Sequence, residues 1–194
     1  MSDLMDDAEL RGKEPDLAGL ENAEALVSTD FPQARVKFEE LANQGSVMAM
    51  LYLAFALSQR GDMEDAKRWY HAAYEKGSST ALFSWASIEY HTGNLREAER
   101  LWDEGVSKND GPCMVWLASR YLGTSDEAKH AEARRLLEKA HEQGQLRATL
   151  LLGKSLATGK YGIGNIPRGL FLFLKFTFSA FGVAYRDPTN RRLW

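Results

Sequence analysis

Residues that could carry out chemistry are few in this sequence, and their spacing forms no catalytic or metal-binding pattern. The histidines are His71, His91, His130 and His141. They form no His-Glu-x-x-His pair, and a single cysteine, Cys113, cannot build a structural zinc site. No serine is followed by a lysine three residues later. Gly162, Gly164 and Gly169 lack the spacing of a phosphate-binding loop and follow no strand. The sequence therefore predicts a non-enzymatic protein without catalytic residues, metal or cofactor.

Charge is distributed unevenly along the chain, which has 194 residues and a net charge of −3. Residues 1–30 hold nine acidic and two basic side chains, a net of −7, whereas residues 160–194 hold six basic and one acidic, a net of +5. Two interpretations stay open: both ends are simply solvated, or they attract each other or a partner. Because the net charge is negative and the basic residues form no stripe, we expect no nucleic-acid binding.

The stretch from Gly61 to Ala81 returns, with changes, along most of the chain. Its closing glycine defines a register: Gly45, Gly77, Asn109 and Gly144, separated by 32, 32 and 35 residues. Eleven residues earlier stands an alanine: Ala34, Ala66, Ala98 and Ala133. Seven residues earlier stands a bulky apolar residue: Phe38, Tyr70, Trp102 and Leu137. Four residues later stands a small residue: Ala49, Ala81, Cys113 and Ala148. Such self-similarity indicates a repeat architecture.

These columns have a helical interpretation. Residues at seven- and eleven-residue offsets lie on one face of a helix, and small residues there let two helices approach closely. The glycines that end the first helix of each unit are expected in left-handed conformation: Gly61, Gly93, Gly123 and Gly159. The candidate N-caps of the second helices are Asp62, Asn94 and Asp126. Each unit is therefore predicted to be a helix-turn-helix of 32–35 residues that cannot bury its apolar face alone.

The pattern resembles the Sel-one-like repeat (SLR) family, which is related to tetratricopeptide repeats. The match is carried by Asp62, Ala66, Trp69-Tyr70, Ala72-Ala73 and Gly77, and Tyr161-Gly162-Ile163-Gly164 resembles the longer inter-helix loop of that family. The Leu-Gly pair of the family is Leu-Ala or Trp-Ala in three copies. The resemblance implies an all-α, right-handed α/α superhelical solenoid of stacked helix-turn-helix repeats, with nine or ten helices. It also implies an adaptor, scaffold or regulatory subunit of a bacterial multiprotein assembly.

The domain boundaries follow from composition and register. Residues 1–15 are expected to be a disordered acidic leader, residues 16–182 the repeat domain, and residues 183–194 a basic tail. A short capping helix is expected over 16–28, followed by helices over 32–43, 47–60, 63–76, 79–91, 95–108, 112–122, 127–142 and 146–158. The acidic N-terminus has no apolar run of an export signal, and one cysteine cannot make an internal disulfide. We therefore expect a cytoplasmic protein.

The segment 166–182 holds five of the nine phenylalanines. They are Phe171, Phe173, Phe176, Phe178 and Phe181. A helix apolar around most of its circumference must be mostly buried, but the end of a solenoid covers one face only. Four covers stay open: the tail folded back with Trp194 as an anchor, a second copy, another protein, or a membrane surface. The apolar run from Gly169 to Tyr185 contains Lys175 and is shorter than the roughly 20 residues that span a bilayer.

Binding of a partner peptide or helix is the predicted function. Stacked helical pairs form a concave surface lined by first helices, and large residues beside the core columns are candidate contacts. These candidates are Tyr52, Tyr90, Trp116 and Arg120. Aromatic and arginine side chains commonly anchor interfaces, although Tyr52 and Trp116 have packing between repeats as an alternative role. The alternative function is a self-associating or peripheral membrane scaffold that acts through the helix at 166–185.

Overall fold

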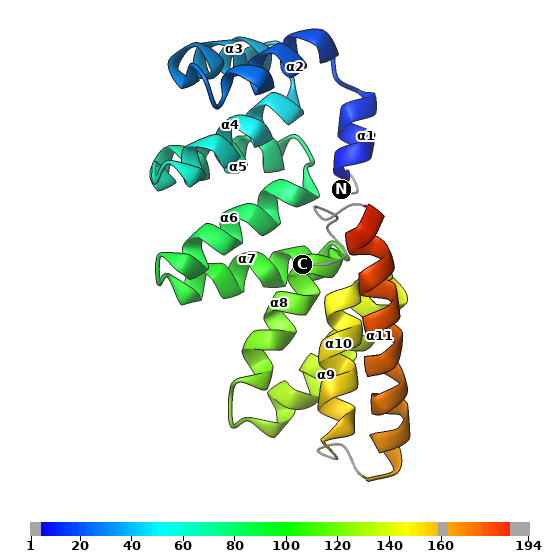
Figure 1. The fold of residues 1–194 in the computed structure, drawn as a ribbon. Helices are drawn as coiled ribbons and strands as arrows, with labels where there is room; N and C mark the ends of the chain where they lie inside the picture. The colour runs from blue at the N-terminus through cyan, green and yellow to red at the C-terminus, as the bar shows by residue number, and fades with distance from the viewer. Residues whose placement is uncertain (1–4, 159–162, 187–194) are drawn as a thin grey trace. The chain divides into compact units, whose positions relative to one another are not determined.

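The computed structural model describes residues 5–158 and 163–186, with side chains up to residue 179. Apart from an isolated parallel bridge between Met5 and Ser78, all regular structure in these residues is helical (Figure 1). The elements are α1 Asp7–Gly12, α2 Leu17–Leu26, α3 Phe31–Asn43, α4 Val47–Gln59, α5 Met63–Glu75, α6 Ser79–His91, α7 Leu95–Ser107, α8 Gly111–Leu122, α9 Glu127–Glu142, α10 Leu146–Ala157, the 3-10 helix η1 Ile163–Asn165 and α11 Ile166–Arg186.

The helices form pairs within two compact units. The N-terminal unit, residues 1–108, contains α1 and the pairs α2–α3, α4–α5 and α6–α7, and the C-terminal unit, residues 109–194, contains α8–α9 and α10–α11. Within each unit, the two helices of a pair pack together and each pair packs on the next. The predicted all-α solenoid of helix-turn-helix repeats is thereby confirmed, and the bounds of α3 to α10 agree with the prediction to about one residue.

The repeat columns form the buried core, as predicted. The alanine column is fully buried, and the bulky column seven residues before the register position is at most 4% exposed in all four copies. Cys113, in the small-residue column, is buried and is not part of a disulfide. Because the small residues sit where helices meet, each pair can dock closely on its neighbour.

The register position needs a left-handed backbone, and this explains the residues found there. Asn109 has φ of 65°, and the glycines of the same register have φ between 80° and 98°. Asparagine is among the few residues with a side chain that tolerate this region, so it substitutes for glycine in one copy. Gly123 departs from the prediction because its φ is −80°, an ordinary helical value that any residue adopts. Gly159 lies outside the described residues.

The second-helix caps were only partly predicted. Asp126 accepts hydrogen bonds from the backbone N–H groups of Ala128 and Lys129, so its assignment is confirmed. Asp62 and Asn94 occupy the N-cap positions of α5 and α7 but make no capping hydrogen bond with their side chains. The amide of Asn94 donates instead to Glu89 Oε2 at 3.0 Å. The contact with Glu89 therefore fixes the Asn94 side chain through its amide nitrogen, whereas a cap would accept through the amide oxygen.

Glu89 is the centre of a polar cluster inside the N-terminal unit. Its side chain, on a residue that is 6% exposed, accepts from Trp85 Nε1 at 3.2 Å and pairs with Lys67 Nζ at 3.3 Å. The cluster joins α5, α6 and the start of α7. Since a buried carboxylate is costly unless it is paired and hydrogen-bonded, these contacts are what permit it at this position.

The predicted disordered leader over 1–15 differs from the structure in residues 5–15. Asp6 caps α1 in a capping box with Glu9, and Leu10 is buried in the core of the N-terminal unit. A helix of six residues is not stable alone, so the tertiary contacts of this segment order it. Residues 1–4 lie outside the described part of the chain, as do 187–194, which include most of the predicted tail and Trp194.

Candidate protein-binding site

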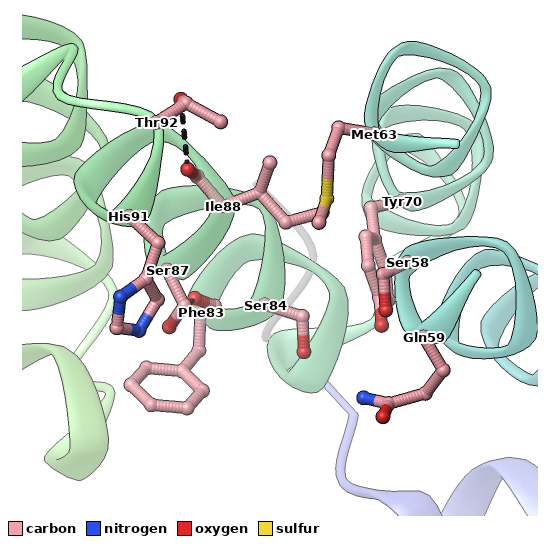
Figure 2. Close-up of a pocket in the computed structure, with 10 residues that line it drawn as sticks. All are labelled: Ser58, Gln59, Met63, Tyr70, Phe83, Ser84, Ser87, Ile88, His91 and Thr92. Atoms are coloured by element: carbon pink, nitrogen blue, oxygen red, sulfur yellow. Dashed lines mark hydrogen bonds between the residues drawn. The ribbon is translucent and has the colours of Figure 1, made fainter. Parts of the chain in front are cut away.

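A groove of about 390 Å³ opens between α6 on one side and α5 with the end of α4 on the other (Figure 2). Its lining comprises Ser58, Gln59, Met63, Tyr70, Phe83, Ser84, Ser87, Ile88, His91 and Thr92. The end of α4 supplies Ser58 and Gln59, α5 supplies Met63 and Tyr70, and α6 supplies the rest. α4 and α6 are the first helices of consecutive pairs, so the groove is lined in part by the helices that the sequence predicted to carry a binding surface.

The hydroxyl of Tyr70 gives the groove a neutral polar point. Burial raises the pKa of Tyr70 to about 12, even though side-chain hydrogen bonds with Ser84 and Ser58 act in the opposite direction. The phenol therefore stays protonated at physiological pH. Figure 2 shows Tyr70 and Ser58 close together on one side of the groove, with Ser84 projecting from α6 towards them.

Three of the other hydroxyls donate their protons to backbone carbonyls four or fewer residues earlier in the chain. Ser58 Oγ donates to the carbonyl of Phe55 at 2.7 Å, and Ser87 Oγ donates to that of Phe83 at 2.9 Å. Thr92 does the same to Ile88 at 2.9 Å. A hydroxyl that donates in this way still has lone pairs to accept with. Together with the apolar surfaces of Met63, Phe83 and Ile88, the groove offers apolar contact and a few hydrogen-bond acceptors.

Tyr52, the first predicted contact residue, already makes contacts within its own unit through its ring and its hydroxyl. Its ring packs edge-on against Phe38, with ring centroids 6.3 Å apart, and its hydroxyl accepts from Arg11 Nη1 at 3.2 Å. Burial raises the pKa of Tyr52, the charge of Glu24 adds to this, and Arg11 opposes it. Tyr52 therefore lies on the first-helix face but is not among the residues that line the groove.

Tyr90 packs inside the pair α6–α7. Its ring lies 5.6 Å from the Trp102 ring and 5.4 Å from the His91 imidazole, measured between centroids. His91 lines the groove, so Tyr90 is one residue away from it without forming its wall. This position makes Tyr90 a support for His91.

Trp116 and Arg120 lie one turn apart on α8, in the C-terminal unit, and both are half-buried. The guanidinium of Arg147, from α10, lies 4.8 Å from the centroid of the Trp116 ring. Trp116 is thereby engaged in cation–π stacking between two first helices. The four predicted contact residues thus divide between the two units, with Tyr52 and Tyr90 in one and Trp116 and Arg120 in the other.

The phenylalanines of α11 were predicted as an apolar interface, and four of them have described side chains. Phe171 is 65% exposed and Phe178 is 80% exposed, while Phe173 is exposed to a smaller extent and Phe176 is half-buried. Leu170 and Leu174 are exposed between them, at positions that share the helix face of Phe171 and Phe178. The side chain of Phe181 lies outside the described residues.

The opposite face of α11 packs on α10 through small residues. Gly169 and Leu172 are buried there, and Gly153 of α10 faces them. Polar groups flank the contact: Arg168 Nη1 lies 3.7 Å from Glu138 Oε1, and His141 Nδ1 lies 2.7 Å from Thr149 Oγ1. Burial lowers the pKa of His141, and the charges of Lys175 and Arg168 lower it further, while Glu142 raises it.

Sequence reasoning missed most of the groove. It assigned Tyr70 to the packing column alone and named no other residue of the lining as a contact. The signal lay in the column itself, where Tyr70 is the one hydroxyl-bearing residue among Phe38, Trp102 and Leu137. Ser58 and Ser84 carried no such signal, because they come close to Tyr70 only when α4 and α6 have packed with α5.

The described residues show neither a metal centre nor a membrane span. Among residues 5–158 and 163–179, no group of three or more His, Cys, Asp or Glu side chains is arranged to hold a metal ion. No helix in the described part of the chain combines the length and the apolar character needed to cross a bilayer.

The paired helices and their shared register define a class: the chain is an α/α-repeat protein. Three solved structures share its arrangement and identify the fold as the Sel1-like repeat (SLR) fold. One is a protective antigen of uropathogenic Escherichia coli strains that displays an SLR fold (24% identity, TM-score 0.62), for which the alignment covers 78% of this chain and 35% of that chain. The predicted SLR resemblance is therefore confirmed at the level of fold.

Two further structures cover more of their own length. A Sel1 repeat protein from Oxalobacter formigenes is 16% identical with a TM-score of 0.67, covering 83% of this chain and 71% of that one. A sel1 repeat protein from Klebsiella pneumoniae subsp. pneumoniae is 23% identical with a TM-score of 0.52, covering 72% and 71%. No family model matches the sequence, and no curated protein matches it.

Proposed function

We propose that this protein is a non-enzymatic interaction module that binds a segment of another protein in the groove between α4 and α6. The observation that carries the proposal is the groove itself, about 390 Å³ in volume, on the face formed by first helices. Proteins built from stacked helical pairs generally bind their partners on such a face. A cytoplasmic location belongs to the same proposal and is supported by the presence of one cysteine, Cys113, which cannot form a disulfide within the chain.

The lining favours a neutral, largely apolar side chain of the partner. Met63, Phe83 and Ile88 supply apolar walls, and the only ionisable side chains that line the groove are Tyr70 and His91. A charged side chain would lose its hydration there without an opposite charge to pair with. An aromatic side chain with one polar atom fits best, because Tyr70 and its serine neighbours offer hydrogen bonds deep in the groove.

Phe55 extends the apolar surface beyond the groove. It is 57% exposed and stands one turn before Gln59 on α4, so both side chains share one face of that helix. A peptide anchored in the groove would reach Phe55 with a neighbouring residue. Exposed aromatic side chains beside a pocket are common anchors of interfaces.

The test is selection of peptides from a phage-displayed random library on the full chain, followed by affinity measurements on two variants. Ser84→Trp fills the groove with an indole and should weaken binding of the selected peptides about tenfold or more. Gln33→Trp, on an exposed position of α3, is the matched control and should leave the affinity unchanged. Equal affinity for both variants, or selection of peptides without an apolar anchor, would overturn the assignment of the groove.

The exposed face of α11 supports a second candidate function, self-association of the protein. Phe173 follows Gly169 by four residues, as the bulky column follows the alanine column. Phe173 is 43% exposed, whereas the bulky column is at most 4% exposed in its four copies. The helix thus has the composition of an internal repeat rather than of a polar cap. A second copy that packs its own α11 on this face would bury Phe171 and Phe178 on both sides.

Sedimentation of the full chain tests this second function. A concentration-dependent dimer is expected for the wild type and a monomer for Phe171→Ser/Phe178→Ser. Exposed Val36 on α3 provides the control Val36→Ser, which should leave the dimer intact. A wild-type protein that stays monomeric, or that floats with liposomes instead, would exclude self-association through α11.

A further inference from the structure

Residues 5–14 lie along the starts of α4 and α6, and the first contact is through the backbone. Met5 N donates to the carbonyl of Gly77 at 2.7 Å, and Ser79 N donates to the carbonyl of Met5 at 3.1 Å. Ser79 Oγ adds a third bond to the same carbonyl at 3.2 Å. All three hydrogen bonds of this isolated parallel bridge use backbone atoms of residue 5. An extended residue of any type except proline, which has no N–H, could therefore make them.

Side chains of the same segment make the next contacts. Asp7 Oδ1 accepts from Thr80 Oγ1 at 2.5 Å, and Glu14 Oε2 accepts from Ser46 Oγ at 2.8 Å. Ser46 is the N-cap of α4, and Thr80 lies in the first turn of α6. Carboxylates are favoured beside such helix starts because the exposed N–H groups carry partial positive charge. The receiving surface therefore selects acidic side chains at two fixed places.

One apolar anchor stands between the two carboxylates. Leu10 is 4% exposed and belongs to the core cluster of the N-terminal unit. On the other side of α1, Arg11 donates to Tyr52 Oη and pairs with Glu21 at 3.1 Å. Figure 1 shows α1 running from the start of α2 towards the start of α6. The segment thus has the form of an extended residue followed by a short acidic amphipathic helix.

The segment is held by few buried groups. Leu10 is its only buried residue between positions 5 and 16, and the hydrogen bonds of Arg11 are exposed. Short helices with exposed hydrogen bonds open at low free-energy cost compared with the core of a domain. The surface beneath can therefore become available without unfolding of α4 and α6.

We propose that the starts of α4 and α6, with Tyr52, form a second interaction surface, and that its partner is an acidic amphipathic segment of another protein. Residues 5–14 are the intramolecular occupant that such a partner displaces. The spacing of residues 5, 7, 10 and 14 defines the partner. It has a residue that pairs through its backbone, then a carboxylate two positions later, a leucine-like anchor five positions later and a second carboxylate nine positions later. None of the receiving residues named above lines the groove, so this surface is independent of the proposed function.

A peptide with the sequence of residues 1–16, carrying a fluorophore, serves as the probe. It is titrated into the full wild-type chain and into the full chain with Met5→Pro/Leu10→Ser, which releases the intramolecular occupant. In the wild type, only the molecules whose residues 5–14 have left the surface can bind the peptide, which lowers its apparent affinity. We therefore expect the peptide to bind the released chain about tenfold or more tighter. A peptide with Asp7→Asn/Glu14→Gln should bind about tenfold more weakly than the acidic peptide.

A second variant also frees the surface from residues 5–14, and it is needed if Leu10→Ser unfolds the protein. Met5→Pro/Asp7→Asn leaves Leu10 in place and changes only half-buried residues. Equal affinity of the peptide for wild-type and released chains that melt as cooperatively as wild type would overturn the proposal. So would absence of binding to both released chains. A wild-type dimer that dissociates on Met5→Pro/Asp7→Asn would assign the surface to a second copy instead, and would likewise overturn it. Ser84→Trp should not alter peptide binding, which separates this surface from the groove.

Discussion

Gly169 and Gly153 meet where α11 crosses α10: a Cβ atom added to Gly169 would lie 2.8 Å from the carbonyl oxygen of Gly153 and 2.3 Å from the backbone N of Ala157. Both neighbours are backbone atoms, which cannot turn aside as a side chain can. We therefore expect Gly169→Ala to push the two helices apart and to lower the free energy of unfolding of the C-terminal unit by about 1–3 kcal/mol.

Thermal and urea unfolding of Gly169→Ala measure this effect. The matched control is Gly12→Ala, since a Cβ at Gly12 meets nothing within 4 Å and its backbone is not left-handed. That variant should keep or slightly raise the stability, because alanine restricts the unfolded chain more than glycine does. Equal stability of the two variants would show that α11 does not depend on the close crossing.

Glu89 is predicted to stabilise the N-terminal unit through the groups it joins. Glu89→Ala removes the acceptor of Trp85 and Asn94 and one partner of Lys67, and should cost about 3 kcal/mol. The control Glu64→Ala removes the other partner of Lys67, at 2.6 Å, but its side chain is 85% exposed and the cost should stay below about 1 kcal/mol. A mild effect of Glu89→Ala in urea unfolding would contradict a structural role for the cluster.

His141 should make the C-terminal unit less stable in mild acid. Its pKa is lowered in the folded state, chiefly by burial and then by Lys175 and Arg168, so the unfolded state binds the proton first. Stability is complete above the unfolded pKa of about 6.5 and is lost as the pH falls from there to the folded pKa. Below both pKa values the loss is constant.

Urea unfolding at about pH 7.5 and about pH 5.5 measures this dependence on either side of the unfolded pKa. His141→Gln should remove part of the decrease, while His71→Gln, on a half-exposed side chain of α5, should retain it. The same decrease in both variants would mean that other groups are responsible.

Trp116 and Arg120 remain predicted partner contacts in the C-terminal unit. Arg120→Ala should weaken partner binding, and Trp116→Ala also removes the ring that stacks with Arg147 and should cost about 1–3 kcal/mol of stability. The double variant Trp116→Ala/Arg120→Ala, still folded by circular dichroism, should bind peptides selected on Ser84→Trp, in which the groove is filled, more weakly than the parent chain does. Full affinity of those peptides for the double variant would remove both residues from the binding surface.

How far sequence reasoning reaches is clear from α5 and α1. The bounds of α5 follow from repetition, since its alanine, aromatic and glycine positions recur in four copies and a periodic signal averages over local exceptions. Helix α1 has no repeated counterpart and only six residues, so its composition suggested disorder. Its order depends on Met5 pairing at Gly77 and Ser79, more than sixty residues away, which no local pattern encodes.

The sequence by itself determined the repeat register, the all-α class and the boundaries of α3 to α10, because each unit must present the same apolar columns to stack. Tertiary structure decided where a ligand could bind. The groove exists because Ser58, Tyr70 and Ser84 come from three helices whose distance is set by packing. The tertiary structure also explains why Gly153 stands where the other copies have alanine. With a glycine on each helix, α11 can lie this close to α10. Spacing along a helix is local information, whereas the space between helices arises only once they have packed.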